Sequence, residues 1–159
     1  MTTLNAGQQL ALAIELAAKY HNGQFDKGGQ PYILHCLKVM HYVKSENPLV
    51  KAAAVMHDLV EDTSVTLDTL TSLGFSSTVV DIVDRMTKKE GQTPEEYLNG
   101  LMQSPNATLV KLADLRHNTD VRRLKGLTDK DLLRMRKYHA MWMRLEAARQ
   151  LHEILEGPQ

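Results

Sequence analysis

The sequence has little of what disulfide-rich, membrane-embedded or nucleic-acid-binding proteins depend on. Cys36 is its only cysteine, so no disulfide can form within the chain and nothing indicates an oxidising compartment. Lys and Arg together number 19, as do Asp and Glu, and this balance creates no overall field that attracts nucleic acid or an anionic membrane. Any anionic ligand must therefore be held by local groups.

Long apolar runs are also missing. No stretch approaches the roughly 18 apolar residues that cross a bilayer. The apolar segment Leu10 to Ala18 is short, contains Glu15 and follows no basic leader, which disfavours a secretory signal peptide. We therefore expect a cytoplasmic protein without a membrane-embedded part.

What the sequence does contain is helical periodicity. The 159 residues, 43% of them hydrophobic, suffice for one domain spanning residues 1–159 with a single core. Apolar residues recur every three to four positions, and no alternating segments with hairpin turns support strands. We expect a compact all-α, multi-helix bundle. The expected helices span residues 5–20, 31–45, 48–62, 67–73, 77–86, 94–102, 106–118 and 129–155, and Gly157 and Pro158 close the last of them.

The most apolar of these helices, at residues 48–62, is interrupted by His57, Asp58, Glu61 and Asp62. An isolated buried charge is costly. At about 100° per residue, Glu61 would lie one turn above His57, and Asp62 one turn above Asp58, which makes a patch of four groups. A divalent cation would neutralise this patch. Its mixture of imidazole and carboxylate suits Mn²⁺, Fe²⁺ or Zn²⁺ better than the all-oxygen shells of Ca²⁺ or Mg²⁺.

Two other apolar helices each contain a polar interruption, His35 in one and Asp114 in the other. Alone, His35 is explained as a hydrogen-bonded core histidine and Asp114 as a capping or ion-paired residue. Together with His57 and Asp58 they supply four ligands from three helices, in the order His, His-Asp, Asp. This order is the pattern of the HD superfamily, and with two acidic residues following, it predicts a metal site.

Water activation follows from such a site. A bound metal lowers the pKa of water and polarises a phosphoryl oxygen, and a nearby carboxylate can take the proton from that water. Glu61 is the expected base, assisted by Asp62. Phosphoryl transfer also needs charge neutralisation, so further cations are candidates for the substrate phosphates, although a solvated surface charge explains each lysine equally well. These substrate-side candidates are Lys27, Lys88, Lys111 and Arg116.

Five segments match a known family in order over roughly residues 8–125: Tyr20–Gln24, Gln30–His35, Ala52–Thr63, Met86–Lys88 and Val110–Asn118. On these segments the sequence resembles the hydrolase domain of the RelA/SpoT family and, in size, the stand-alone small alarmone hydrolases. The resemblance implies removal of the 3′-pyrophosphate from ppGpp and pppGpp. At 159 residues, the chain leaves room only for this hydrolytic half.

The resemblance also implies roles for individual residues. Asn118 would contact the nucleotide sugar, and Glu61 and Asp62 would handle the attacking water. One Mn²⁺ would be held by His35, His57, Asp58 and Asp114.

The departures from the family fall on the substrate side. Asp26-Lys27 stands where the family has Arg-Lys, whose arginine packs on guanine. Arg116 is displaced by one residue along its helix, and Val121 replaces a threonine that contacts nucleotide. Cys36 replaces a proline and is a potential soft ligand, although core packing explains it better. The chemistry is therefore better defined than the substrate.

Two alternatives stay open. The first is an HD-type nucleotidase or phosphodiesterase acting on another nucleotide, which Asp26 and Val121 favour because they alter the base and sugar side. The second is a metal-stabilised nucleotide-binding module without turnover. That module would require a lost base or ligand, and none is lost here.

Overall fold

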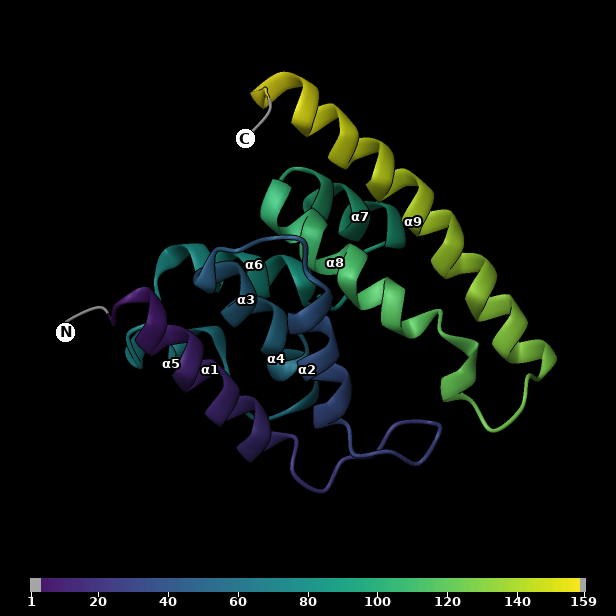
Figure 1. The fold of residues 1–159 in the computed structure, drawn as a ribbon, viewed down its shortest axis with the longest axis horizontal. Helices are drawn as coiled ribbons and strands as arrows, with labels where there is room; N and C mark the ends of the chain where they lie inside the picture. Colours follow the sequence, from purple (N-terminus) through teal and green to yellow (C-terminus); the bar gives the residue numbers. More distant parts are fainter. Residues whose placement is uncertain (1–3, 158–159) are drawn as a thin grey trace.

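The structure, a computed structural model, describes residues 4–157 and is helical throughout this range apart from its connecting loops (Figure 1). Its only strand-like feature among these residues is an isolated bridge between Phe25 and Pro31. The all-α prediction is confirmed. The elements are α1 (Ala6–Tyr20), α2 (Ile33–Tyr42), α3 (Pro48–Val55), α4 (Leu59–Asp62), α5 (Leu67–Ser72), α6 (Ser77–Met86), α7 (Pro94–Met102), α8 (Pro105–Asn118), the 3₁₀ helix η1 (Val121–Arg123) and α9 (Asp129–Glu156).

Short polar side chains cap the beginning of most of these helices. The Asn5 side chain accepts a hydrogen bond from the backbone amide of Gln8, and the Gln8 side chain accepts one from the backbone amide of Asn5. Two amides that would lack a partner in the first helical turn are thereby satisfied. Thr128 and Asp131 form the same capping box at the start of α9. Gly157 ends that helix with φ 78°, whereas Pro158 lies outside the described residues.

The prediction of one continuous helix over residues 48–62 is wrong. It is interrupted between α3 and α4, where Met56 and Asp58 have φ near −100° and ψ near 0° (−98°, 6° and −102°, 2°). On an unbroken helix His57 and Asp58 would point about 100° apart. The interruption instead brings His57 Nε2 within 2.9 Å of Asp58 Oδ2. The predicted stacking of Glu61 over His57 along one helix is lost with it.

The helix expected at residues 31–45 is also too long. Pro31 lies in the bridge with Phe25 rather than in a first helical turn, and α2 ends at Tyr42 because Val43 is extended, with φ −61° and ψ 126°.

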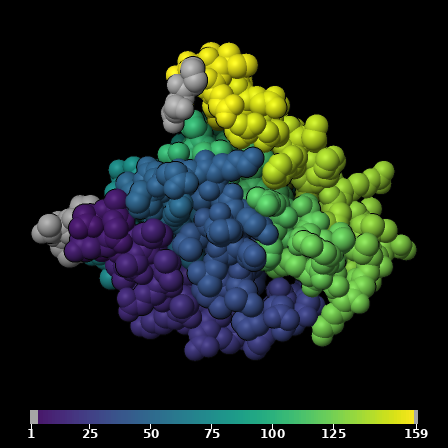
Figure 2. All heavy atoms as spheres, in the orientation of Figure 1, coloured from purple at the N-terminus to yellow at the C-terminus, as the bar shows by residue number. Residues whose placement is uncertain are grey.

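The central element is α3, whose alanines and valines are buried on all sides. Helices α1, α2 and α6 pack against it, and α8 packs against α2 and α6. The long α9 lies across α8 and α7 on one side of the molecule (Figures 1 and 2), with Leu145 its only fully buried side chain. Helix α2, the α3–α4 turn and α8 thus converge, although they are far apart in sequence. None of the helices described is long and apolar enough to cross a membrane.

Candidate metal centre and substrate pocket

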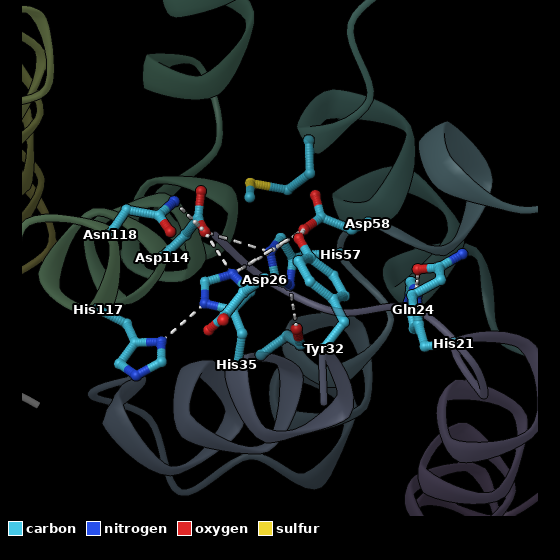
Figure 3. Close-up of polar contacts among 12 residues, drawn as sticks. His21, Gln24, Asp26, Tyr32, His35, His57, Asp58, Asp114, His117 and Asn118 are labelled. Atoms are coloured by element: carbon cyan, nitrogen blue, oxygen red, sulfur yellow. Dashed lines mark hydrogen bonds and ion pairs between the residues drawn. The ribbon is translucent and has the colours of Figure 1, made fainter. Parts of the chain in front are cut away.

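Four side chains converge where α2, the α3–α4 turn and α8 meet (Figure 3). His35 Nε2 lies 3.3 Å from His57 Nε2, and His57 Nε2 lies 2.9 Å from Asp58 Oδ2. Asp114 Oδ1 lies 3.0 Å from His35 Nε2 and 3.2 Å from His57 Nε2. The structure therefore brings together all four residues that the sequence nominated as metal ligands.

This donor set fits a divalent transition metal. Bonds of about 2.1 Å at right angles place neighbouring ligand atoms about 3.0 Å apart, and most of the separations observed are close to this value. One ligand atom each from His35, His57 and Asp58 lies within 4.8 Å of the other two. Two imidazole nitrogens with carboxylate oxygens form a set that Mn²⁺, Fe²⁺ and Zn²⁺ accept.

The two carboxylates of the cluster are compensated by neighbouring cations. Burial opposes charge on both carboxyls, but His57 beside Asp58 lowers the pKa of Asp58 to about 2, and Lys111 holds the pKa of Asp114 well below its usual value. Lys111 Nζ donates to Asp114 Oδ2 at 2.8 Å. The two carboxylates also raise the pKa of His57 well above its usual value, despite complete burial. A divalent cation at the cluster would stabilise the two carboxylates in place of a proton on His57.

Neighbouring groups fix the orientation of the cluster. His57 Nδ1 lies 2.8 Å from the carbonyl oxygen of Ala54, which can only accept, so His57 donates there and turns Nε2 toward the cluster. The Tyr32 hydroxyl donates to Asp58 Oδ2, and burial keeps that hydroxyl protonated by raising its pKa. Asn118 Nδ2 donates to Asp114 Oδ1 at 2.9 Å.

The two acidic residues after the HD pair are both exposed but have different neighbours. Glu61 is exposed, and its Oε1 accepts a hydrogen bond from the backbone amide of Lys88 at 2.9 Å. For Asp62, burial first, then the Asp58 and Glu61 carboxylates, raise the pKa. Gln24 ties the backbone of Asp62 to the loop before α2, with Nε2 3.2 Å from the Asp62 carbonyl oxygen.

A pocket of about 260 Å³ opens beside the cluster. Its wall includes Tyr32 and Asn118, the residues bonded to Asp58 and Asp114. The wall also contains the acidic Asp26 and Asp120 and the apolar Leu124 and Met135. Its cationic and aromatic side chains suit a phosphorylated ligand with a planar base. They are Phe25, Lys27, Arg123, Arg134 and Tyr138.

The remaining substrate-side candidates lie elsewhere. Lys111 is buried against Asp114 rather than in the pocket. Lys88 Nζ lies 5.4 Å from the ring centre of Tyr97. Arg116 stacks on Tyr42 at 3.9 Å and, with Val121, lines a different pocket. Only Lys27 and Asn118 of the nominated residues line the pocket beside the cluster. Cys36 lies in the apolar core, where burial raises its pKa to about 12.

Arg123 is a pocket residue that the sequence did not reveal. Its Nη2 lies 3.1 Å from Asp26 Oδ2, and its Nη1 donates to Asn118 Oδ1 at 3.2 Å (Asp26 and Asn118 in Figure 3). The other Asp26 oxygen accepts from the Gln30 amide at 2.8 Å. The anion at position 26 therefore anchors a guanidinium from η1, 97 positions further along the chain. The only indication of this contact in the sequence was the unexpected acidic residue at position 26.

Gly28 allows the loop that carries Asp26 to approach Arg123 closely. A Cβ at Gly28 would overlap the backbone carbonyl oxygen of Arg123, whereas a Cβ at Gly126 would meet nothing within 4 Å. We predict that Gly28→Ala lowers the free energy of unfolding by about 1–3 kcal/mol because the loop must move away from η1. Gly126→Ala, the matched control, should change it by less than about 0.5 kcal/mol. Urea unfolding measures both, and equal stability of the two variants would contradict the loop contact.

Comparison with known proteins places this site in a family. Residues 13–117 match the family model described as HD domain. The chain belongs to the HD domain family. The match runs from within α1 almost to the end of α8, so it includes all four residues of the cluster, and α9 lies outside it.

Two relatives of this HD domain chain have names that refer to guanosine nucleotides. Guanosine-3′,5′-bis(diphosphate) 3′-pyrophosphohydrolase MESH1 of Mus musculus is 36% identical over 121 residues, which are 69% of this chain and 67% of that protein. A probable GTP pyrophosphokinase of Mycobacterium leprae is 33% identical over 117 residues, covering 67% of this chain but 15% of that protein. The chain thus spans only a small part of the long bacterial relatives.

A solved structure has the same fold. It is described as a metazoan ortholog of SpoT that hydrolyses ppGpp, and it superposes with a TM-score of 0.71 over 94% of this chain and 96% of its own. At 22% sequence identity, this likeness concerns the fold. The superposition also covers residues outside 13–117, the range that the family model matches.

Proposed function

We propose that this HD domain, over residues 1–159, is a metal-dependent phosphohydrolase that removes the 3′-pyrophosphate of (p)ppGpp. One observation carries the proposal: His35, His57, Asp58 and Asp114 converge beside a pocket lined with cations and aromatic rings. The name of the mouse relative supports the choice of nucleotide. Nothing in the charge balance of the chain favours nucleic acid instead.

The four residues of the cluster would hold one divalent ion, in our proposal Mn²⁺, with Fe²⁺ or Zn²⁺ able to replace it. When bound, such an ion polarises a phosphoryl oxygen and lowers the pKa of water. Tyr32, Asn118 and the Ala54 carbonyl group hold the ligands in place by the hydrogen bonds described above.

Glu61 would accept the proton of the attacking water, with Asp62 orienting that water. The water oxygen bonds to phosphorus, the bond from phosphorus to the ribose 3′-oxygen breaks, and the 3′-oxygen leaves with a proton from solvent. The Lys88 amide holds the Glu61 carboxylate at 2.9 Å and so limits its motion. Lys27 and Arg123 would face the phosphates, and Asn118 the sugar.

A specific observation favours the second candidate, hydrolysis of another nucleotide. The Asp26 carboxylate, 3.1 Å from Arg123, offsets one of the few positive charges of the pocket. A nucleotide with fewer negative charges than ppGpp would lose less binding energy from this reduction in positive charge.

A substrate panel distinguishes the two candidates. Purified protein with Mn²⁺ is given ppGpp, a nucleoside 3′,5′-bisphosphate, NADPH and nucleoside monophosphates, and released phosphate and pyrophosphate are measured. We expect kcat/KM to be highest for ppGpp, with pyrophosphate as the product. Preference for another member of the panel would replace the substrate while keeping the chemistry. A metal-loaded protein inert on every member would favour the binding module.

The single buried cysteine and the absence of a membrane-spanning helix among the described residues agree with action in the cytoplasm, where we propose that this reaction occurs.

A further inference from the structure

A histidine that is not part of the four-residue cluster contacts one that is. His35 Nδ1 lies 2.8 Å from His117 Nδ1, and the two rings stack with centroids 5.0 Å apart and planes inclined by 20°. Figure 3 shows His117 on the side of His35 that faces away from Asp114 and His57. We propose that His117 is a positioning residue, which sets the tautomer and ring orientation of His35 for metal binding. The inference rests on the proposed metal site.

The tautomer follows from which nitrogens meet. His35 Nε2 points to the cluster, 3.0 Å from Asp114 Oδ1, and must be unprotonated to bind a metal. The proton of neutral His35 then lies on Nδ1, which donates to His117 Nδ1. His117 must accept, so its own proton lies on Nε2. One hydrogen bond therefore determines the tautomers of both rings.

The His117 ring is held against His35 by its neighbours. Tyr42 meets the ring edge-on, with centroids 6.0 Å apart and planes inclined by 66°. Arg123 Nη1 donates to the His117 carbonyl oxygen at 3.1 Å. The ring has little freedom to turn away from His35.

The position of His117 on α8 gives this helix two tasks. Asp114, one turn earlier, supplies a carboxylate to the cluster, and His117 supports His35 from α2. A shift of α8 would move both contacts together. Hydrogen-bond partners of metal ligands typically change metal affinity by about 10–100-fold when removed.

Two substitutions separate the hydrogen bond from simple packing. His117→Phe keeps an aromatic ring against His35 and Tyr42 but removes the acceptor. His117→Asn places Oδ1 where the Nδ1 acceptor was, so the hydrogen bond can form without the ring. Metal-free wild type and both variants are titrated with Mn²⁺, and free Mn²⁺ is followed by electron paramagnetic resonance. Thermal unfolding with chelator present checks that each variant folds.

We expect the Kd for Mn²⁺ to rise about 10–100-fold in His117→Phe and to stay within about threefold of wild type in His117→Asn. Unchanged affinity in His117→Phe would overturn the inference, as would equal losses in both variants, because packing would then be the cause. A wild type that binds no Mn²⁺ would overturn the proposed function and this inference with it.

A measurement on the unaltered protein covers the case in which a variant does not fold. In Zn²⁺-loaded protein with ¹⁵N-labelled histidine, long-range ¹H–¹⁵N spectra report which ring nitrogens carry protons. We expect His117 with a bare Nδ1 and His35 with a protonated Nδ1. A proton on His117 Nδ1 would contradict the proposed hydrogen bond.

Discussion

Replacing Asp58 with asparagine is expected to lower kcat/KM by at least about a thousandfold. The change keeps the shape of the side chain but removes the charge on Oδ2, 2.9 Å from His57 Nε2. A metal ion contributes several kcal/mol to phosphoryl transfer, and about 4 kcal/mol corresponds to a thousandfold change in rate. Mn²⁺ content of the purified variant, measured beside pyrophosphate release, tests whether activity and metal are lost together.

Asp81→Asn is the matched control for this variant. Asp81 pairs with Arg85 on the exposed face of α6, so the same loss of charge should leave both metal content and activity unchanged. Full activity in Asp58→Asn would contradict the proposed ligand set. Full metal content with lost activity would make Asp58 a catalytic group rather than a ligand.

Replacing Glu61 with glutamine is expected to lower kcat by about 10²–10⁴-fold while Mn²⁺ binding is retained. Loss of a general base has this size of effect. Glutamine Oε1 can still accept from the Lys88 amide, which lies 2.9 Å away, so the local structure should be kept. Glu46→Gln is the control, because that fully exposed glutamate lies outside the site and pairs only with Lys51 among the described residues.

Asp62→Asn distinguishes the two acidic residues. Burial and the neighbouring carboxylates raise the pKa of Asp62, so its protonated form persists to a higher pH than for an ordinary aspartate. If Asp62 were the base, activity would begin to fall, as the pH is lowered, at a pH above that expected for an ordinary aspartate, and Asp62→Asn would lose most of the activity. Near-normal kcat in Glu61→Gln together with a large loss in Asp62→Asn would contradict our assignment.

The cluster could be predicted from sequence because each member interrupts an apolar helix. His35 and Asp114 are buried positions where charge needs compensation, and periodicity alone indicates this. The interruption at Met56 could not be predicted, since nothing in the apolar sequence from Pro48 to Val60 disfavours a longer helix. Tertiary packing determines that turn, which brings His57 and Asp58 together.

The supporting contacts could not be predicted because they join distant segments. His117 meets His35 across 82 positions, and Arg123 meets Asp26 across 97. Lys111 illustrates the opposite difficulty. A lysine at this position would be expected to be a solvated surface charge, but the Lys111 side chain is buried and neutralises Asp114. Spacing along a chain indicates which residues share a helix face, but not which faces meet.

Pyrophosphate release from ppGpp by chelator-treated protein, before and after Mn²⁺ is restored, tests the central claim most directly. We predict no release without metal, recovery when about one Mn²⁺ binds per chain, and no recovery in Asp58→Asn. Release that is unchanged by chelation, or that returns equally in Asp58→Asn, would contradict a metal centre built on His35, His57, Asp58 and Asp114.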